Sequence, residues 1–213
     1  MPRVVLTPPI LCLVTDRTAC AGRPLDSVVG AAVAGGVRLV QLREKGLPAR
    51  ELLLIGAMLL EPVHEGGGLL VVNDRLDVAL ALGADGVHLG SNSLPVEVAR
   101  RVLGDSMLIG VSVHSTEEAI RFEREGADYL ILGTIFETRS HPGTPPAGLG
   151  LVSEVTAAVK IPVMAIGGIT ETNVGSVISA GASGAAVITA IQSAQDVEAA
   201  TRALLAAMSF STR

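Results

Sequence analysis

A single histidine, His114, follows the apolar run Met107–Val113 at the point where a helix is expected to begin. The run MLIGVSV favours a β-strand, and Ser115 followed three residues later by Glu118 is typical of a capping box that opens a helix. An imidazole has a pKa near neutrality and can accept and return a proton, which makes His114 a candidate acid/base group. The alternative is a structural histidine whose ring is held by a neighbouring carbonyl.

Polar residues follow other apolar runs in the same way. One run ends in Gln41–Lys45 (QLREK), a second in Asn73–Arg75 (NDR), and a third leads into the long loop Gly133–Gly150. The carboxyl ends of parallel strands meet on one face, so these groups would converge with His114. Each cluster alone is better explained as a solvated loop with surface ion pairs. Together they favour a pocket for an anionic ligand.

A pair of glycines, Gly167 and Gly168, follows the next apolar run, and the last run continues through Ile188 and Thr189. Glycine leaves backbone N–H groups accessible, and such loops bind phosphate in parallel α/β barrels. The Gly-Gly pair is a weak signal by itself. Its place after the seventh run predicts a phosphate site.

Eight apolar segments alternate with eight helical patterns along the chain. The expected strands are Ile10–Thr15, Val37–Leu42, Leu69–Val72, Val87–Leu89, Met107–Val113, Tyr129–Leu132, Val163–Ile166 and Ala185–Ile188. The expected helices are Leu25–Ala34, Ala49–Leu60, Asp77–Leu82, Val96–Leu103, Thr116–Glu125, Leu151–Val159, Glu171–Ala180 and Asp196–Ala207. This alternation predicts an α/β fold, a (β/α)8 TIM barrel, with residues 1–213 forming a single domain.

The composition agrees with buried parallel strands under helices, since 49% of the 213 residues are hydrophobic and only 2% are aromatic. A net charge of −5 without long runs of one sign argues against a nucleic-acid partner. Two cysteines are too few for a disulfide framework or a zinc site. No stretch approaches a membrane-spanning length, so we expect a cytoplasmic protein without a membrane anchor.

Taken together, these segments resemble the thiamine phosphate synthase superfamily over nearly the whole chain. The segments that carry the resemblance are Gln41–Lys45 (QLREK), Asn73–Ala79 (NDRLDVA), Gly86–Gly90 (GVHLG), Ser112–Ser115 (SVHS), Gly126–Tyr129 (GADY) and Ala165–Ile169 (AIGGI). The superfamily has two similar branches. The synthase joins a pyrimidine diphosphate to a thiazole phosphate, and the TenI-like thiazole tautomerase aromatises the carboxythiazole phosphate before that coupling.

Departures from the synthase pattern favour the tautomerase branch. The synthase has an acidic magnesium ligand shortly after GVHLG, where this chain has Ser91–Pro95 (SNSLP), and a diphosphate-binding lysine where it has His141. Asp74 matches the other magnesium ligand, but one carboxylate among neutral side chains is a poor site for magnesium bound to a diphosphate. The loop Phe136–Leu149 begins with FET and ends with PPAGL, which is similar to the tautomerase version.

The resemblance therefore implies a thiazole tautomerase, an isomerase of thiamine biosynthesis in which His114 moves the proton and no metal or other cofactor is needed. The substrate would be a small phosphorylated thiazole. Its remaining atoms would be bound by Gln41, Arg43, Lys45, Asn73, Ser112, Thr138 and Ser140. Its phosphate would be bound by the backbone at Gly167, Gly168, Ile188 and Thr189.

Other interpretations stay open from the sequence. The first alternative is a thiamine phosphate synthase, a transferase that would need magnesium. The second is a non-catalytic regulator that binds a phosphorylated ligand. For Arg43 and Lys45, the alternative to ligand binding is an ion pair with Glu44 at the strand end. We interpret His64 and His88 as structural, and the superfamily suggests a homodimer.

Overall fold

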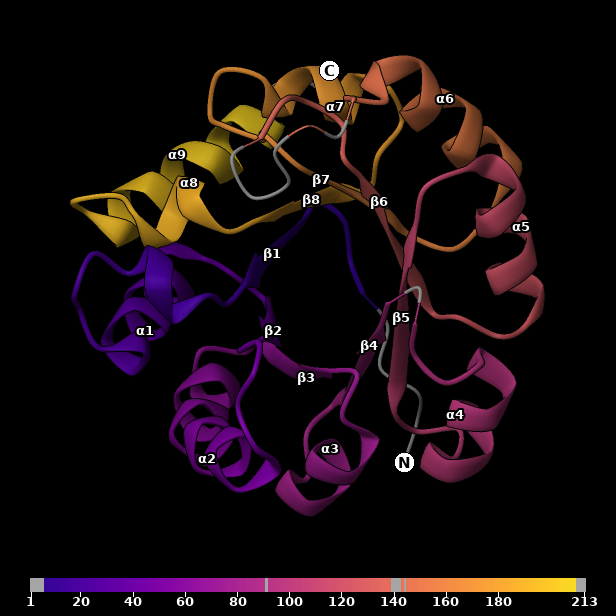
Figure 1. The fold of residues 1–213 in the computed structure, drawn as a ribbon. Helices are drawn as coiled ribbons and strands as arrows, with labels where there is room; N and C mark the ends of the chain where they lie inside the picture. Colours follow the sequence, from indigo (N-terminus) through magenta and orange to yellow (C-terminus); the bar gives the residue numbers. More distant parts are fainter. Residues whose placement is uncertain (1–5, 91, 139–142, 144, 210–213) are drawn as a thin grey trace.

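A computed structural model describes residues 6–90, 92–138, 143 and 145–209. Its eight parallel strands follow one another in chain order around a closed barrel, and β8 pairs with β1 (Figure 1). The strands are β1 (Ile10–Val14), β2 (Leu39–Leu42), β3 (Leu69–Asn73), β4 (Gly86–Leu89), β5 (Leu108–Val113), β6 (Tyr129–Gly133), β7 (Val163–Ile166) and β8 (Gly184–Val187). The predicted TIM barrel is confirmed.

Helices surround the barrel, one or more after each strand (Figure 1). They are η1 (Arg17–Ala19), α1 (Leu25–Gly35), α2 (Ala49–Glu65), α3 (Leu76–Leu82), α4 (Val96–Leu103), α5 (Thr116–Arg124), α6 (Gly148–Ala158), α7 (Val174–Ser179), α8 (Thr189–Gln192) and α9 (Val197–Ser209). No helix in the described ranges combines the length and apolar character needed to span a bilayer. Both cysteines are free and buried.

Several elements begin or end at other residues than expected. Helix α6 begins at Gly148 rather than at Leu151, and α7 begins at Val174 rather than at Glu171. The last strand was expected to run through Ile188, but it ends at Val187 and α8 begins at Thr189. Helix α2 was expected to end at Leu60, but it continues past Pro62. The proline removes one backbone donor, yet the added turn is retained because Val63 is fully buried.

The strands divide their side chains between two apolar layers. The outward-facing ones pack beneath the helices in the larger cluster. The inward-facing ones fill the barrel with Ile10, Cys12, Val14, Leu39, Val71, Leu108, Tyr129, Ile131, Met164 and Ala186. Because side chains alternate along a strand, polar residues in phase with this inner set face the barrel axis.

The phenol ring of Tyr129 lies over Gly110, the position in β5 that has no side chain. Tyr129 is fully buried and is opposite Gly110 in the strand register. A Cβ atom on Gly110 would lie 2.0 Å from the Tyr129 Cζ atom, so glycine is required here by the close approach of the ring.

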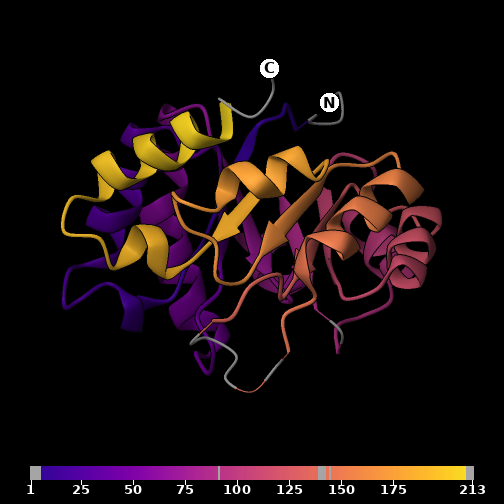
Figure 2. The ribbon, with the colours of Figure 1, turned by 90° about the horizontal axis from the view of Figure 1, so that it is seen from above.

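The carboxyl ends of the strands define the face that carries the candidate site. Figure 2 shows the arrows of β7 and β8 pointing toward the end of the barrel from which the described parts of the β6–α6 connection project. Gln41, Asn73, Ser112 and His114 all lie at or just beyond the carboxyl ends of their strands.

Gly110→Ala is expected to destabilise the protein by about 1–3 kcal/mol, because the added methyl group overlaps the ring of Tyr129. Gly30→Ala in α1 is the matched control. A Cβ atom there meets nothing within 4 Å, so this helical substitution should be neutral or stabilising by up to about 1 kcal/mol. Urea unfolding at pH 7 measures both. Equal stability of the two variants would contradict the packing described for Tyr129.

Candidate functional site

A cleft of about 270 Å³ opens between the carboxyl ends of β2 and β3. It is lined by Leu42, Arg43, Glu44, Lys45, Gly46, Leu47, Leu52, Asn73, Asp74 and Arg75. The structure therefore brings together three of the predicted binding residues, Arg43, Lys45 and Asn73. Gln41 is buried on the inner face of β2, directly below them.

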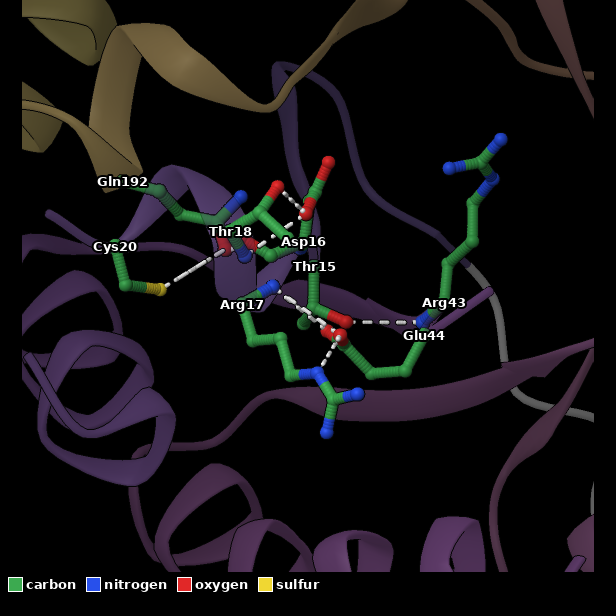
Figure 3. A network of polar contacts seen from close by, with 8 residues as sticks. All are labelled: Thr15, Asp16, Arg17, Thr18, Cys20, Arg43, Glu44 and Gln192. Atoms are coloured by element: carbon green, nitrogen blue, oxygen red, sulfur yellow. Dashed lines mark hydrogen bonds and ion pairs between the residues drawn. The ribbon is translucent and has the colours of Figure 1, made fainter. Parts of the chain in front are cut away.

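Glu44 is the buried member of this group. Both of its carboxylate oxygens accept from the backbone N–H of Arg17, at 3.2 and 3.1 Å, and the Arg17 Nε atom lies 3.9 Å away. The side chain is only 3% exposed. On the neighbouring residue, the backbone N–H of Arg43 donates to Thr15 Oγ1 at 2.9 Å. These contacts tie the loop after β1 to the end of β2 (Figure 3).

Gln192 of α8 holds the same loop from the other side. Its Oε1 accepts from the backbone N–H of Asp16 at 3.0 Å, and its Nε2 donates to the carbonyl of Val14 at 2.9 Å. Gln192 is fully buried, so its amide is satisfied by groups that would otherwise be unpaired. The end of β1 is thus fixed between β2 and α8.

The pairing of Glu44 with Arg17 decides between the two interpretations of the strand-end cations. Ion pairs of Arg43 or Lys45 with Glu44 were the alternative to ligand binding, and neither residue makes an ion pair with any residue that the structure describes. Figure 3 shows the Arg43 side chain extending away from the Glu44 carboxylate. Two cations are therefore available at the cleft.

Asp74 supplies the carboxylate of the cleft, and its backbone is in the left-handed region, with φ at 60°. Such a conformation is uncommon for a residue other than glycine and is typical of functional sites. Its Oδ1 accepts from the hydroxyl of Ser93 and, at 3.4 Å, from the N–H of Gly90, and its Oδ2 accepts from Asn73 Nδ2 at 2.9 Å. The described residues contain no cluster of three or more histidine, cysteine, aspartate or glutamate side chains that could hold a metal.

The exposed ring of His114 lies against β6. Its Nδ1 is 2.5 Å from the carbonyl oxygen of Gly133, and a carbonyl only accepts, so Nδ1 carries the hydrogen. The expected cap is present: Ser115 Oγ accepts from the N–H of Glu118 at 3.2 Å, and Glu118 reaches back to the N–H of His114 at 2.7 Å. A carbonyl thus holds this histidine, and its acid/base role stays a prediction.

The two glycines of the predicted phosphate site have a structural reason of their own, which is the close approach of a neighbouring loop. Gly167 and Gly168 have φ values of 100° and 64°, and a Cβ atom on Gly168 would lie 2.4 Å from the carbonyl oxygen of Glu137. The glycines therefore let the β6–α6 connection approach β7, and phosphate binding there stays a prediction.

Three further predicted residues frame the same end of the barrel. Ile188 and Thr189 begin α8, and the half-buried Thr138 follows β6. Ser140 and His141, together with Ser91, lie outside the described residues.

Comparison with known proteins places the chain in a family. Residues 11–191 match the family model described as thiamine monophosphate synthase. The chain belongs to this family. It is 47% identical over 196 residues to the thiamine-phosphate synthase of Roseiflexus castenholzii, covering 92% of this chain and 86% of that protein. It is 49% identical over 195 residues to that of Methanoculleus marisnigri, covering 91% and 92%.

Solved structures agree with this membership. The thiamine phosphate pyrophosphorylase from Pyrococcus furiosus superposes with a TM-score of 0.88 at 40% identity, covering 96% of this chain and 97% of that one. A 3-hexulose-6-phosphate synthase superposes with a TM-score of 0.72 at 20% identity, covering 93% and 99%, and shares the fold alone.

The family relatives show that the prediction of a thiazole tautomerase, an isomerase, was wrong. Relatives at 47% and 49% identity over more than nine-tenths of the chain are named synthases. The prediction rested on short segments around Ser93 and in the Phe136–Leu149 loop. Such segments lie in surface connections, which vary more readily than the barrel that this thiamine monophosphate synthase family shares.

Sequence reasoning missed Glu44, Gln192 and His88 as parts of the site's support. His88 was interpreted as structural, but it faces the barrel axis from β4 and hydrogen-bonds Ser112 Oγ at 2.9 Å. A signal was present in the strand GVHL, where the only polar side chain is in phase with the inward-facing positions. Glu44 and Gln192 carried no such signal, because their partners lie far away in the sequence.

Burial of His88 should make folding stability depend on pH. Burial lowers the pKa of His88 to about 3, while an unfolded histidine titrates near 6.5. Below pH 6.5 the unfolded chain gains a proton that the folded chain does not, so this histidine destabilises the fold as the pH falls. Its contribution from pH 7 to pH 5 is a loss of about 2 kcal/mol in unfolding free energy.

Urea unfolding of the parent and of His88→Gln at both pH values isolates this contribution. The variant should lose less stability on acidification, by about 2 kcal/mol, whatever its stability at pH 7. His64→Gln is the control, since its ring is 42% exposed and pairs with Asp85 at 2.9 Å. Parallel pH profiles for the parent and His88→Gln would contradict the assignment.

Proposed function

We propose that this protein is a thiamine-phosphate synthase, a transferase that joins hydroxymethylpyrimidine diphosphate to thiazole phosphate. The observation that carries the proposal is the pair of cations Arg43 and Lys45, which line a cleft of about 270 Å³ and form no ion pair with any described residue. A diphosphate needs such groups, because guanidinium and ammonium donors form charge-assisted hydrogen bonds with its oxygens. The identity to relatives named thiamine-phosphate synthase supports the same assignment.

The reaction breaks one bond and forms another without a net proton transfer. The methylene carbon of the pyrimidine loses its bond to the diphosphate oxygen and gains a bond to the thiazole nitrogen. The leaving diphosphate takes the bonding electrons, and the thiazole becomes a cation. Negative charge therefore develops on the leaving group, where Arg43 and Lys45 would stabilise it. The protein's main tasks are to hold the two substrates in line and to bind the developing charge.

Magnesium is the metal that this reaction implies. From the sequence, one carboxylate was expected to be a poor site for it, but the diphosphate supplies further oxygen ligands, so the donor set at the cleft fits the ion. Asp74 is exposed at the cleft and offers a carboxylate, and magnesium in phosphate sites is commonly held by one or two carboxylates together with substrate oxygens. Asp74 would hold the ion, with the hydroxyl of Ser93 and the amide of Asn73 beside it. When bound, magnesium would neutralise part of the diphosphate charge.

The remaining predicted residues receive roles in the same reaction. Thr138 and the backbone at Gly167, Gly168, Ile188 and Thr189 would bind the phosphate of the thiazole, as the superfamily resemblance implies. Ser112 faces the mouth of the barrel between the two substrate regions. His114 has no assigned step, because the coupling transfers no proton.

The direct test is to incubate purified protein with both phosphorylated substrates and magnesium and to follow thiamine phosphate and released diphosphate by chromatography. We expect equal amounts of the two products, and none without magnesium. Absence of both products at saturating substrates would reject the function.

Arg43→Gln is expected to lower kcat/KM for coupling by about 10²-fold, because a charge-assisted contact with the diphosphate is worth roughly 1.5–3 kcal/mol. The matched control is Arg101→Gln, which removes the same charge from an exposed position on α4. It should change kcat/KM less than 2-fold. Steady-state kinetics and urea unfolding compare them, and equal kinetic losses in the two variants would contradict the role of Arg43.

Ser93→Asp is expected to strengthen magnesium binding about 10-fold, because it places a second carboxylate against Asp74. Asn92→Asp adds the same charge at an exposed neighbouring position and should have a smaller effect. The magnesium concentration for half-maximal activity, and the rise in Tm on adding magnesium, measure the change. An unchanged magnesium requirement in Ser93→Asp would place the ion elsewhere.

A further inference from the structure

Two buried side chains and one half-buried side chain form a hydrogen-bonded series from the centre of the barrel to its mouth. His88 of β4, which is 2% exposed, lies between Tyr129 of β6 and Ser112 of β5. Its Nδ1 is 3.3 Å from the Tyr129 hydroxyl, and its Nε2 is 2.9 Å from Ser112 Oγ. The two rings stack with centroids 5.7 Å apart.

The hydrogen atoms in this series can be ordered in two ways, because a neutral imidazole has one donor and one acceptor nitrogen. In the first order, Tyr129 donates to Nδ1, and the Nε2–H of His88 donates to Ser112 Oγ. In the reverse order, Ser112 donates to Nε2 and Nδ1–H donates to Tyr129. The phenol hydrogen then needs another acceptor, and the described part of the chain gives the Tyr129 hydroxyl no hydrogen-bond partner besides His88.

The first order gives an acceptor to the phenol hydrogen of Tyr129 and to the imidazole hydrogen of His88, whereas the reverse order leaves the buried phenol hydrogen without one. An unsatisfied buried donor costs about 1–3 kcal/mol, which is enough to decide between the two. In the first order, one lone pair of Ser112 Oγ is occupied by His88. The Ser112 hydrogen is then not donated to His88 and is available to an acceptor at the mouth of the barrel.

We propose that Tyr129 and His88 are positioning residues that fix Ser112 as a hydrogen-bond donor to an anionic oxygen of the phosphorylated substrate. The inference rests on the proposed function, since it takes Ser112 as a substrate contact. Oxygens of a phosphate or diphosphate only accept, so a hydroxyl whose hydrogen already points outward binds them without reorganisation. The same hydroxyl is prevented from donating to His88.

The protonation states of His88 and Tyr129 support a fixed arrangement of these hydrogen atoms. Burial lowers the pKa of His88 to about 3 and raises the pKa of Tyr129 well above its usual range. Asp74 and Arg43, the charged groups that act on His88, shift its pKa in opposite directions and by less than burial does. Neither ring titrates between pH 5 and pH 9, and the hydrogens stay where the geometry puts them.

Nitrogen-15 NMR of the ligand-free protein, labelled in its histidine rings, tests the order directly. The chain has four histidines, and the His88 signals are those that disappear in His88→Gln. We expect His88 to be neutral, with hydrogen on Nε2, and unchanged from pH 5 to pH 9. In Tyr129→Phe the Nδ1–H form should become more populated, because its competing donor is gone. A parent spectrum with hydrogen on Nδ1 would overturn the proposal.

A double-mutant cycle tests the consequence for the substrate. Tyr129→Phe keeps the ring and removes only the hydroxyl, and it should lower kcat/KM for coupling about 3- to 10-fold in the parent background. In the Ser112→Ala background the same substitution should change kcat/KM less than 2-fold. A merely structural tyrosine would give the same fold-change in both backgrounds, and this result would also overturn the proposal.

The NMR measurement and the coupling assay can contradict the two proposals independently of each other. A protein that shows hydrogen on Nε2 but forms no thiamine phosphate would refute the proposed synthase function and leave the hydrogen order established. A protein that couples the substrates but has hydrogen on Nδ1 would refute the positioning role alone.

Discussion

The phenol ring of Tyr129 lies inside the barrel, and the arrangement of the site depends on the space made for it. Tyr129 is the only aromatic residue in the inner apolar cluster, and it fits because Gly110 presents no side chain beneath it. The ring carries a hydroxyl group inside an apolar layer, and burying that hydroxyl costs free energy unless it has a hydrogen-bond partner. His88 is that partner, and its second nitrogen carries the polar connection up to Ser112. The packing of Tyr129 at the centre of the barrel is thus connected, through His88, to the hydroxyl of Ser112 at its mouth.

A second constraint acts at the carboxyl ends of β1 and β2, where the carboxylate of Glu44 is kept apart from the neighbouring cations. The buried carboxylate of Glu44 accepts from the backbone of Arg17, so it is occupied by the loop after β1 rather than by the neighbouring cations. Thr15 fixes the backbone of Arg43 at the same time. The guanidinium of Arg43 is therefore held near an acid without being neutralised by it. An anion can bind such a cation without first breaking an ion pair.

Most of the fold could be predicted because buried parallel strands and their covering helices leave strong periodic signals, as in Val163–Ile166 and Val96–Leu103, whose bounds were predicted correctly. The cations of Gln41–Lys45 could be placed at the strand ends for the same reason. The partner of Glu44 could not be predicted, because Arg17 is 27 residues away and comes close only on barrel closure. The choice of branch failed because short loop segments were weighed above similarity spread along the whole chain.

The proposed synthase function also changes what the polar groups at the mouth have to do. A tautomerase depends on a group that titrates near neutrality, whereas coupling with loss of diphosphate depends on charges and donors that stay fixed. The arrangement suits the second requirement. His88 is kept neutral by burial, and the guanidinium of Arg43 carries a permanent charge. Under the proposed function, fixed groups of this kind would stabilise the leaving diphosphate without reorganising.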